Sequence, residues 1–196
     1  MSFSATAQKK ASEPHLPGEV GIWMFIAGDL IMFSLFFGTF VFYRSQNVEL
    51  YIEAQNMLNQ TYGLVNTLLM LTSSWFVAMA VKGARLRKYE ISSRCFAMAC
   101  VCGIGFVLVK YFEYGEKLQA GITLETNDYF MYYYLFTGIH LLHVFIGLGV
   151  LVFCYKTVHQ TAFSGLQLTH VESGASFWHL VDMLWIVLFA LLYLMR

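Results

Sequence analysis

Charged residues are scarce in this chain: Asp, Glu, Lys and Arg together make up 12% of its 196 residues. Soluble domains carry about 25%, so the chain lacks the charge that would coat a water-facing surface of this size. The 12 basic and 12 acidic residues cancel, and nothing in this balance points to nucleic acid. With 58% hydrophobic residues and a mean hydropathy of +0.60, the composition indicates a membrane protein.

The apolar part of the chain also contains neither proline nor paired cysteine motifs, and we expect no cleavable leader before it. The two prolines, Pro14 and Pro17, precede the first apolar run, so the runs contain no proline kink. The spacing Cys100-x-Cys102 lacks a second pair and does not predict a zinc or iron–sulfur site, so all four cysteines are expected to be buried free thiols. The first eighteen residues have no short apolar core, so we expect the first apolar run to remain as a membrane anchor.

Five apolar runs have the length of about 20 residues that a helix needs to cross a hydrocarbon core of about 30 Å. A chain in lipid must satisfy its own backbone hydrogen bonds, and no alternating barrel pattern is present, so each run is predicted to be a helix. We therefore predict an all-α polytopic domain of five transmembrane helices over 18–196, after a flexible cytoplasmic tail at 1–17. A short surface helix is expected within 45–62. The predicted spans are Val20–Tyr43, Gly63–Val81, Ser93–Phe112, Tyr132–Tyr155 and Ala175–Leu194.

Basic residues are distributed unequally between the connections of these spans. Segment 82–94 contains five Lys or Arg residues, whereas segment 113–131 contains four acidic residues and Lys117 as its single cation. The positive-inside rule then places the amino terminus in the cytoplasm and the carboxyl terminus outside. Lys110 lies near the outer end of the third span, and we expect its long side chain to snorkel outward.

Ionisable side chains also occur at membrane depth. Such groups cost roughly 3 kcal/mol or more in lipid, so they usually face protein or water. At a rise of 1.5 Å per residue, Asp29 lies ~15 Å deep in the first span and Asp182 ~11 Å into the fifth. The i, i+3 spacing places His179 with Asp182, and His140 with His143, on a shared helix face.

Three interpretations of these groups compete: hydrogen bonding between helices, a proton path that uses Asp29, and ligation of a haem or metal. Two histidines three residues apart on one helix do not bracket a haem. His140, His143 and His179 together could in principle form a metal site. Pairing between helices is the favoured interpretation.

Small polar and aromatic residues predict where the helices pack. Asn66, Ser73 and Ser74 form a polar stripe on the second span, which is typical of helix interfaces in lipid. Trp178, Asp182 and Trp185 follow i, i+4, i+7 spacing, so we expect them to face a partner helix, with the two tryptophans in packing or lipid contacts.

The same spans resemble subunit III of the haem-copper oxidases. Five motifs carry the resemblance, each on its own span and in the same order. They are Gly18-Glu19-Val20-Gly21-Ile22-Trp23 with Gly28-Asp29, Asn66-Thr67 with Ser73-Ser74, Phe112-Glu113-Tyr114, Phe136-Thr137-Gly138-Ile139-His140-Leu141-Leu142-His143, and Phe177-Trp178-His179-Leu180-Val181-Asp182 with Trp185. Longer members have seven helices, and this chain looks like the short bacterial form. Phe177 stands where an aromatic residue with a hydroxyl is common.

The resemblance implies a non-redox accessory subunit of a cytochrome c or quinol oxidase in the bacterial inner membrane. Such subunits pack on the catalytic subunit I, which holds the haem and copper, and they bind structural phospholipids. They support assembly, stability and proton uptake during aerobic electron transport. No catalytic, cofactor-binding or metal-ligating residue is expected in this chain. Asp29 is the candidate proton-responsive group, and the candidates for a polar network between helices are Glu113, His140, His143, Glu172, His179 and Asp182.

Alternatives remain open at this point. The opening motif is also similar to the branch associated with nitric oxide reductases, which would make the chain an accessory membrane protein in denitrification. A small proton-coupled transporter is a different class, but transporters usually show repeated halves or broken helices, and neither is seen here. An independent di-haem membrane cytochrome is the third alternative.

Overall fold

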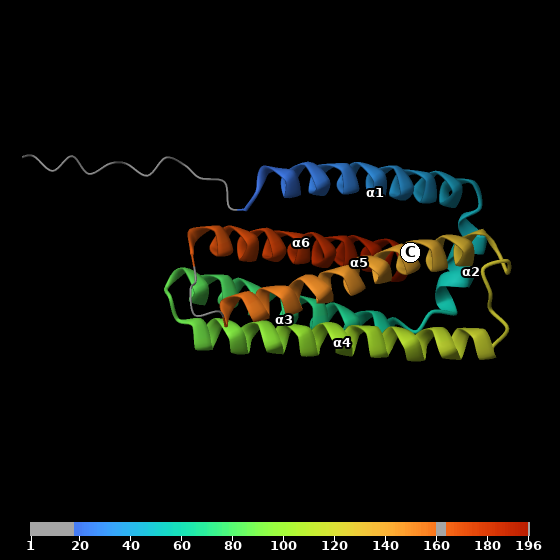
Figure 1. The fold of residues 1–196 in the computed structure, drawn as a ribbon. Helices are drawn as coiled ribbons and strands as arrows, with labels where there is room; N and C mark the ends of the chain where they lie inside the picture. Colours follow the sequence, from blue (N-terminus) through green and yellow to red (C-terminus); the bar gives the residue numbers. More distant parts are fainter. Residues whose placement is uncertain (1–17, 160–163, 196) are drawn as a thin grey trace, which may run out of the picture.

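The computed structural model describes residues 18–159 and 164–195, so the predicted tail at 1–17 lies outside the described residues. Within them the chain forms helices and no strand (Figure 1). Five helices are long and apolar enough to cross a membrane, which confirms the predicted all-α polytopic fold. The elements are α1 (Val20–Gln46), the short α2 (Val48–Asn56), α3 (Gln60–Arg85), α4 (Tyr89–Gln119), α5 (Asp128–Val158), α6 (Gly165–Phe189) and a terminal π-helical turn (Ala190–Leu194).

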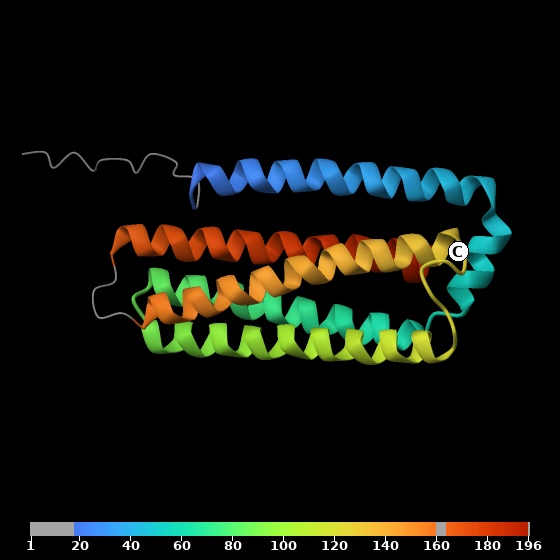
Figure 2. The same ribbon diagram turned by 45° about the vertical axis from the view of Figure 1, so that its right-hand side comes forward.

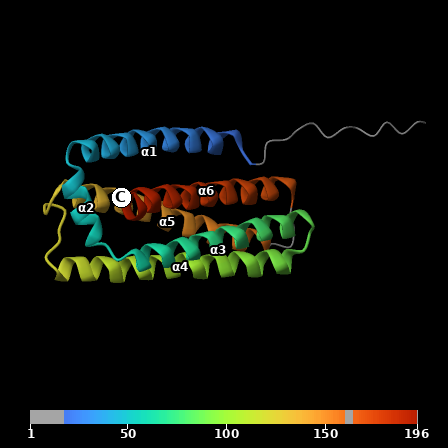
Figure 3. The same ribbon diagram turned by 180° about the vertical axis from the view of Figure 1, so that it is seen from behind.

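Four of the long helices form a ring in which α3 contacts α4, α4 contacts α5, α5 contacts α6 and α6 contacts α3. Helix α1 lies along the outside of this ring beside α6, and α2 joins it to α3 (Figures 1 and 2). The start of α1 and the turn between α3 and α4 lie at one end of the molecule, which we call the basic end (Figure 3). The α1–α2 junction and the connection at 120–127 lie at the other, which we call the acidic end (Figure 3).

Helix α6 begins at Gly165, ten residues before the predicted start at Ala175. Polar residues interrupt the apolar run there, but the protein accommodates them: Ser164 and Gln167 form a capping box, and Arg85 pairs with Glu172. The predicted boundary was therefore wrong. Asp182 lies ~26 Å from the start of α6 and ~18 Å from the end of the span at Leu194.

An aromatic cluster joins α1, α2 and α5 at the acidic end. Phe40 lies against Tyr51, Tyr129, Tyr132 and Phe136, with ring centroids 5.4–6.2 Å apart. Burial raises the pKa of the Tyr51 phenol to about 12, so this side chain stays neutral. The cluster fixes the position of the predicted short helix.

Close approach between α5 and α6 depends on glycine. A Cβ at Gly147 would lie 2.7 Å from the Trp178 ring, and one at Gly174 would lie 2.7 Å from Sγ of Cys154. Trp178 is fully buried in this contact. The two glycines therefore let a tryptophan side chain and a cysteine side chain fit between the helices.

Candidate functional site

Helices α1 and α5 bring Asp29 and His143 together. Nε2 of His143 lies 3.2 Å from Oδ1 of Asp29, and both side chains are buried. Asp29 is ~14 Å from the start of α1, and His143 is at the midpoint of α5. The other carboxylate oxygen of Asp29 has no hydrogen-bond partner among the described residues.

The second hydrogen bond of His143 defines where protons are held in this pair. Its Nδ1 lies 2.9 Å from the carbonyl oxygen of Ile139, and a carbonyl can only accept, so Nδ1 carries a proton. Nε2 then either donates as part of an imidazolium to the Asp29 carboxylate, or accepts from a protonated Asp29. In both states one proton lies between Asp29 and His143, and the pair is neutral overall.

His140 does not join this pair, although it lies one turn away. Both ring nitrogens are buried without a hydrogen-bond partner in the described chain. The ring packs 5.6 Å from Phe106 and 5.3 Å from Trp185, measured between centroids. In this structure His140 is therefore a packed aromatic ring.

A second pair lies inside the bundle towards the acidic end. Lys110 Nζ donates to Oε2 of Glu113 at 2.9 Å and to the Tyr193 hydroxyl at 3.0 Å. The Tyr193 hydroxyl in turn donates to Oε1 of Glu113 at 2.5 Å. Lys110 is 2% exposed, so the expectation that it snorkels outward was wrong. The i, i+3 spacing of Lys110 and Glu113 is the sequence signal that could have predicted the pair.

The remaining ionisable candidates lie between α3 and α6. Ser74 Oγ is 2.6 Å from Nδ1 of His179, and Arg85 Nε donates to Glu172 at 2.8 Å. Asp182 is 7% exposed, and its Oδ1 has no partner among the described residues. The candidates thus form separate local contacts instead of one network, and His140 and Oδ1 of Asp182 lie outside these contacts. Sequence reasoning missed the role of Arg85, whose partner is 87 positions away.

The polar residues predicted to form a stripe on α3 also have separate surroundings. Ser73 donates to the carbonyl of Ala99 on α4, whereas both amide atoms of Asn66 are buried without a partner in the described chain. Trp185 donates from Nε1 to the hydroxyl of Thr67 at 3.1 Å. Trp178 and Trp185 are both 0% exposed, so within this chain neither is free to contact lipid.

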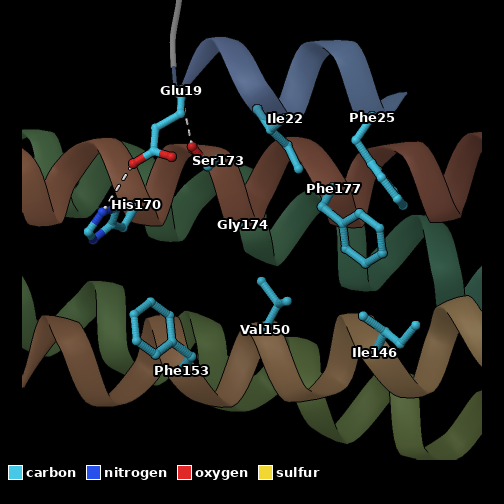
Figure 4. Close-up of a pocket in the computed structure, with 10 residues that line it drawn as sticks. All are labelled: Glu19, Ile22, Phe25, Ile146, Val150, Phe153, His170, Ser173, Gly174 and Phe177. Atoms are coloured by element: carbon cyan, nitrogen blue, oxygen red, sulfur yellow. Dashed lines mark hydrogen bonds and ion pairs between the residues drawn. The ribbon is translucent and has the colours of Figure 1, made fainter. Parts of the chain in front are cut away.

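An apolar groove opens between α1, α5 and α6 towards the basic end (Figure 4). Helix α5 crosses the bundle obliquely and runs away from α1 in this direction (Figure 2). The groove has a volume of about 450 Å³. Its walls are the side chains of Ile22, Phe25, Ile146, Val150, Phe153 and Phe177.

Polar groups gather at the mouth of this groove. The backbone N–H of Glu19 donates to Ser173 Oγ at 2.9 Å, and the Glu19 carboxylate lies 3.2 Å from Nε2 of His170 (Figure 4). An apolar interior beneath a polar rim is complementary to an amphiphile.

Metal-ligating residues do not cluster in the described chain. Across 18–159 and 164–195, no three side chains of His, Cys, Asp or Glu are placed so that they could hold a metal ion. His140, His143 and His179 in particular have separate surroundings, as described above. The fold and these pairs define a multi-pass α-helical membrane protein whose ionisable groups mostly bond to one another.

Comparison with known proteins identifies the family. Residues 16–196 match cytochrome c oxidase subunit III. The probable cytochrome c oxidase subunit 3 of Mycobacterium bovis is 28% identical over 180 residues, which are 90% of this chain and 87% of the relative. Cytochrome bo(3) ubiquinol oxidase subunit 3 of Buchnera aphidicola is 22% identical over 174 residues, 89% of this chain and 84% of the relative.

A further relative is much longer. The haem-copper oxidase subunit I+III of Aeropyrum pernix is 29% identical over 179 residues, which are 88% of this chain but 22% of that protein. The match to the family extends over nearly the whole chain. This chain therefore belongs to the cytochrome c oxidase subunit III family, as its motifs predicted.

Proposed function

We propose that this chain is an accessory subunit of a respiratory haem-copper oxidase, with no redox centre of its own. The observation that carries the proposal is the family match over residues 16–196. The separate polar pairs support it, because ionisable groups that bond to one another serve helix packing. The haem and copper would then reside in the partner catalytic subunit.

The catalytic subunit I is the proposed partner. The name of the Aeropyrum pernix relative joins subunits I and III in one protein, which supports a position of this chain beside subunit I. We also propose the bacterial inner membrane as its location. The basic end would face the cytoplasm, because five of its Lys and Arg residues lie within 82–94.

The groove between α1, α5 and α6 is our proposed phospholipid site. Its volume of about 450 Å³ falls within the range of about 300–1,000 Å³ typical of ligand pockets. The apolar walls would hold an acyl chain, and Glu19, His170 and Ser173 would lie at the depth of the headgroup. A lipid held here would fill the space between α1 and the ring of four helices.

Asp29 is our proposed proton-responsive group. Its pairing with His143 holds one proton between two titratable side chains, and no described residue bonds to its second oxygen. Either proton position leaves the pair neutral, so a proton can shift without leaving a buried net charge. We infer from this arrangement that Asp29 takes part in proton uptake by the complex.

Purification of the tagged chain from its native membranes in mild detergent tests the proposal. We expect the catalytic subunit of a haem-copper oxidase to co-purify in equal amount, with a Soret band that follows that partner. A Soret band from the isolated polypeptide would refute the proposal and support a cytochrome. Co-purification with a nitric oxide reductase would instead assign the chain to denitrification. Full function without a companion would favour a transporter.

A further inference from the structure

Polar side chains line the seam between α3 and α6 on the outer surface of the bundle. Ser74 and Trp75 come from α3, and His179 and Asp182 come from α6. The Arg85–Glu172 pair closes the seam at the basic end. We call Ser74, Trp75, His179 and Asp182 the polar seam.

The polar seam lies at the middle of both helices. His179 is ~21 Å from the first residue of its span and ~23 Å from the last. Trp75 is ~23 Å from the start of α3 and ~15 Å from its end. These groups therefore lie far from the headgroup region, where tryptophan and histidine would find water.

Hydrogen-bonding capacity is left over in the polar seam. Nδ1 of His179 is occupied by Ser74, but no residue of the described chain bonds to its Nε2. Asp182 lies just beneath this surface, and its Oδ1 is buried, so a docking helix does not reach this atom. Trp75 is 60% exposed, and its indole packs on Phe76 without an acceptor among the described residues. Acyl chains at this depth cannot satisfy any of these atoms.

Other outer faces of the bundle at this depth carry large apolar side chains. On α4 these include Val101, Ile104 and Leu108, and on α5 they include Leu142 and Phe145, each more than 50% exposed. Such faces suit lipid. The face of α3 and α6 also exposes Leu71 and Met183, but it adds the polar groups of the polar seam to them.

The shape of the seam admits another helix. A hollow of about 190 Å³ opens beside His179, and it is lined in part by Ala78, Ala175 and Ser176. Small residues let two helix backbones approach closely, and hydrogen bonds between polar side chains then join the helices.

We propose that this face is where a transmembrane helix of the catalytic subunit docks. That helix would present a hydroxyl or amide side chain at mid-membrane depth to Nε2 of His179. It would also cover the exposed indole of Trp75. The inference rests on the proposed function and adds to it the surface of contact and the chemistry of the partner.

Photocrosslinking within the intact complex tests the surface. p-Benzoylphenylalanine is introduced in place of Trp75 on α3, or of Met183 on α6, which is 46% exposed and one turn beyond His179. Phe145 on α5 is the matched control: it is aromatic, 53% exposed and near the middle of its helix. Helices α3 and α5 lie on different sides of the bundle (Figures 1 and 3).

We expect irradiation to crosslink the Trp75 and Met183 variants to the catalytic subunit at least tenfold more than the Phe145 variant. Equal crosslinking, or crosslinking from Phe145 alone, would overturn the docking face and leave the proposed function intact. The face would also be wrong if the complex co-purified but neither seam position crosslinked. The proposed function itself would fail if neither the unmodified chain nor any of the variants co-purified with a catalytic subunit.

Discussion

Replacing Glu113 with leucine tests whether the Glu113 carboxylate stabilises the buried ammonium group of Lys110. Lys110 is 2% exposed and Glu113 is 1% exposed, so neither charge is solvated by water. The carboxylate accepts from both Lys110 and Tyr193. The Glu113→Leu substitution therefore leaves one buried cation and one buried hydroxyl without their acceptor.

Breaking a buried pair by removing one partner costs about 3–5 kcal/mol. At 1.4 kcal/mol per factor of ten, the unfolding equilibrium should shift on the order of a hundred- to several-thousand-fold. The rings of Trp185 and Tyr133 lie 4.8 and 5.3 Å from the ammonium nitrogen of Lys110 and remain in the variant. Cation–π attraction of about 2 kcal/mol when desolvated is therefore present in both proteins and leaves this difference unchanged.

Removing both charges should recover much of the stability. In Lys110→Met/Glu113→Leu, the hydroxyl of Tyr193 still lacks its acceptor, which leaves a loss of about 1–3 kcal/mol. Adding Tyr193→Phe should remove that remaining cost. Exposed Glu116 on the same helix supplies the control, and Glu116→Leu should change stability by less than about 1 kcal/mol.

Reversible unfolding by SDS in mixed micelles, followed by circular dichroism, measures these differences. The reasoning fails if Glu113→Leu alone costs less than about 1 kcal/mol. It also fails if Lys110→Met/Glu113→Leu is less stable than Glu113→Leu. The unpaired ammonium group of Lys110 would then not be the cause of the lost stability.

Three other substitutions test the packing, the groove and the proton site. Gly147→Ala should cost about 1–3 kcal/mol because its Cβ meets Trp178 at 2.7 Å, whereas Gly149→Ala, with no atom within 4 Å, should be neutral or slightly stabilising in the same unfolding assay. Val150→Trp should fill the groove, and quantitative lipid mass spectrometry should find less phospholipid per purified chain; unchanged lipid content would exclude the groove as the site. Asp29→Asn should assemble normally because its amide can still hydrogen-bond to the partner imidazole, but sustained turnover of the complex should fall. Normal turnover would rule out a proton role.

Hydrophobic run length was sufficient to predict the five membrane helices, because lipid forces every buried backbone group into helical bonding. It was insufficient for the start of α6. There, Glu172 interrupts the apolar run, and only its pairing with Arg85 shows that the helix continues towards the basic end. The ends of a helix thus depend on contacts with residues that are distant in the sequence.

The fold class, the family and the identity of the ionisable groups in the apolar runs could be predicted from the amino-acid sequence, because they follow from local composition and ordered motifs. Which of these groups contact one another could be seen only in the folded chain. Folding joined Asp29 to His143 across 114 positions, left His140 among aromatic rings and buried Lys110 instead of extending it outward. The physical reason is that helix rotation and tilt set the partner of each side chain, and both depend on packing across the whole bundle.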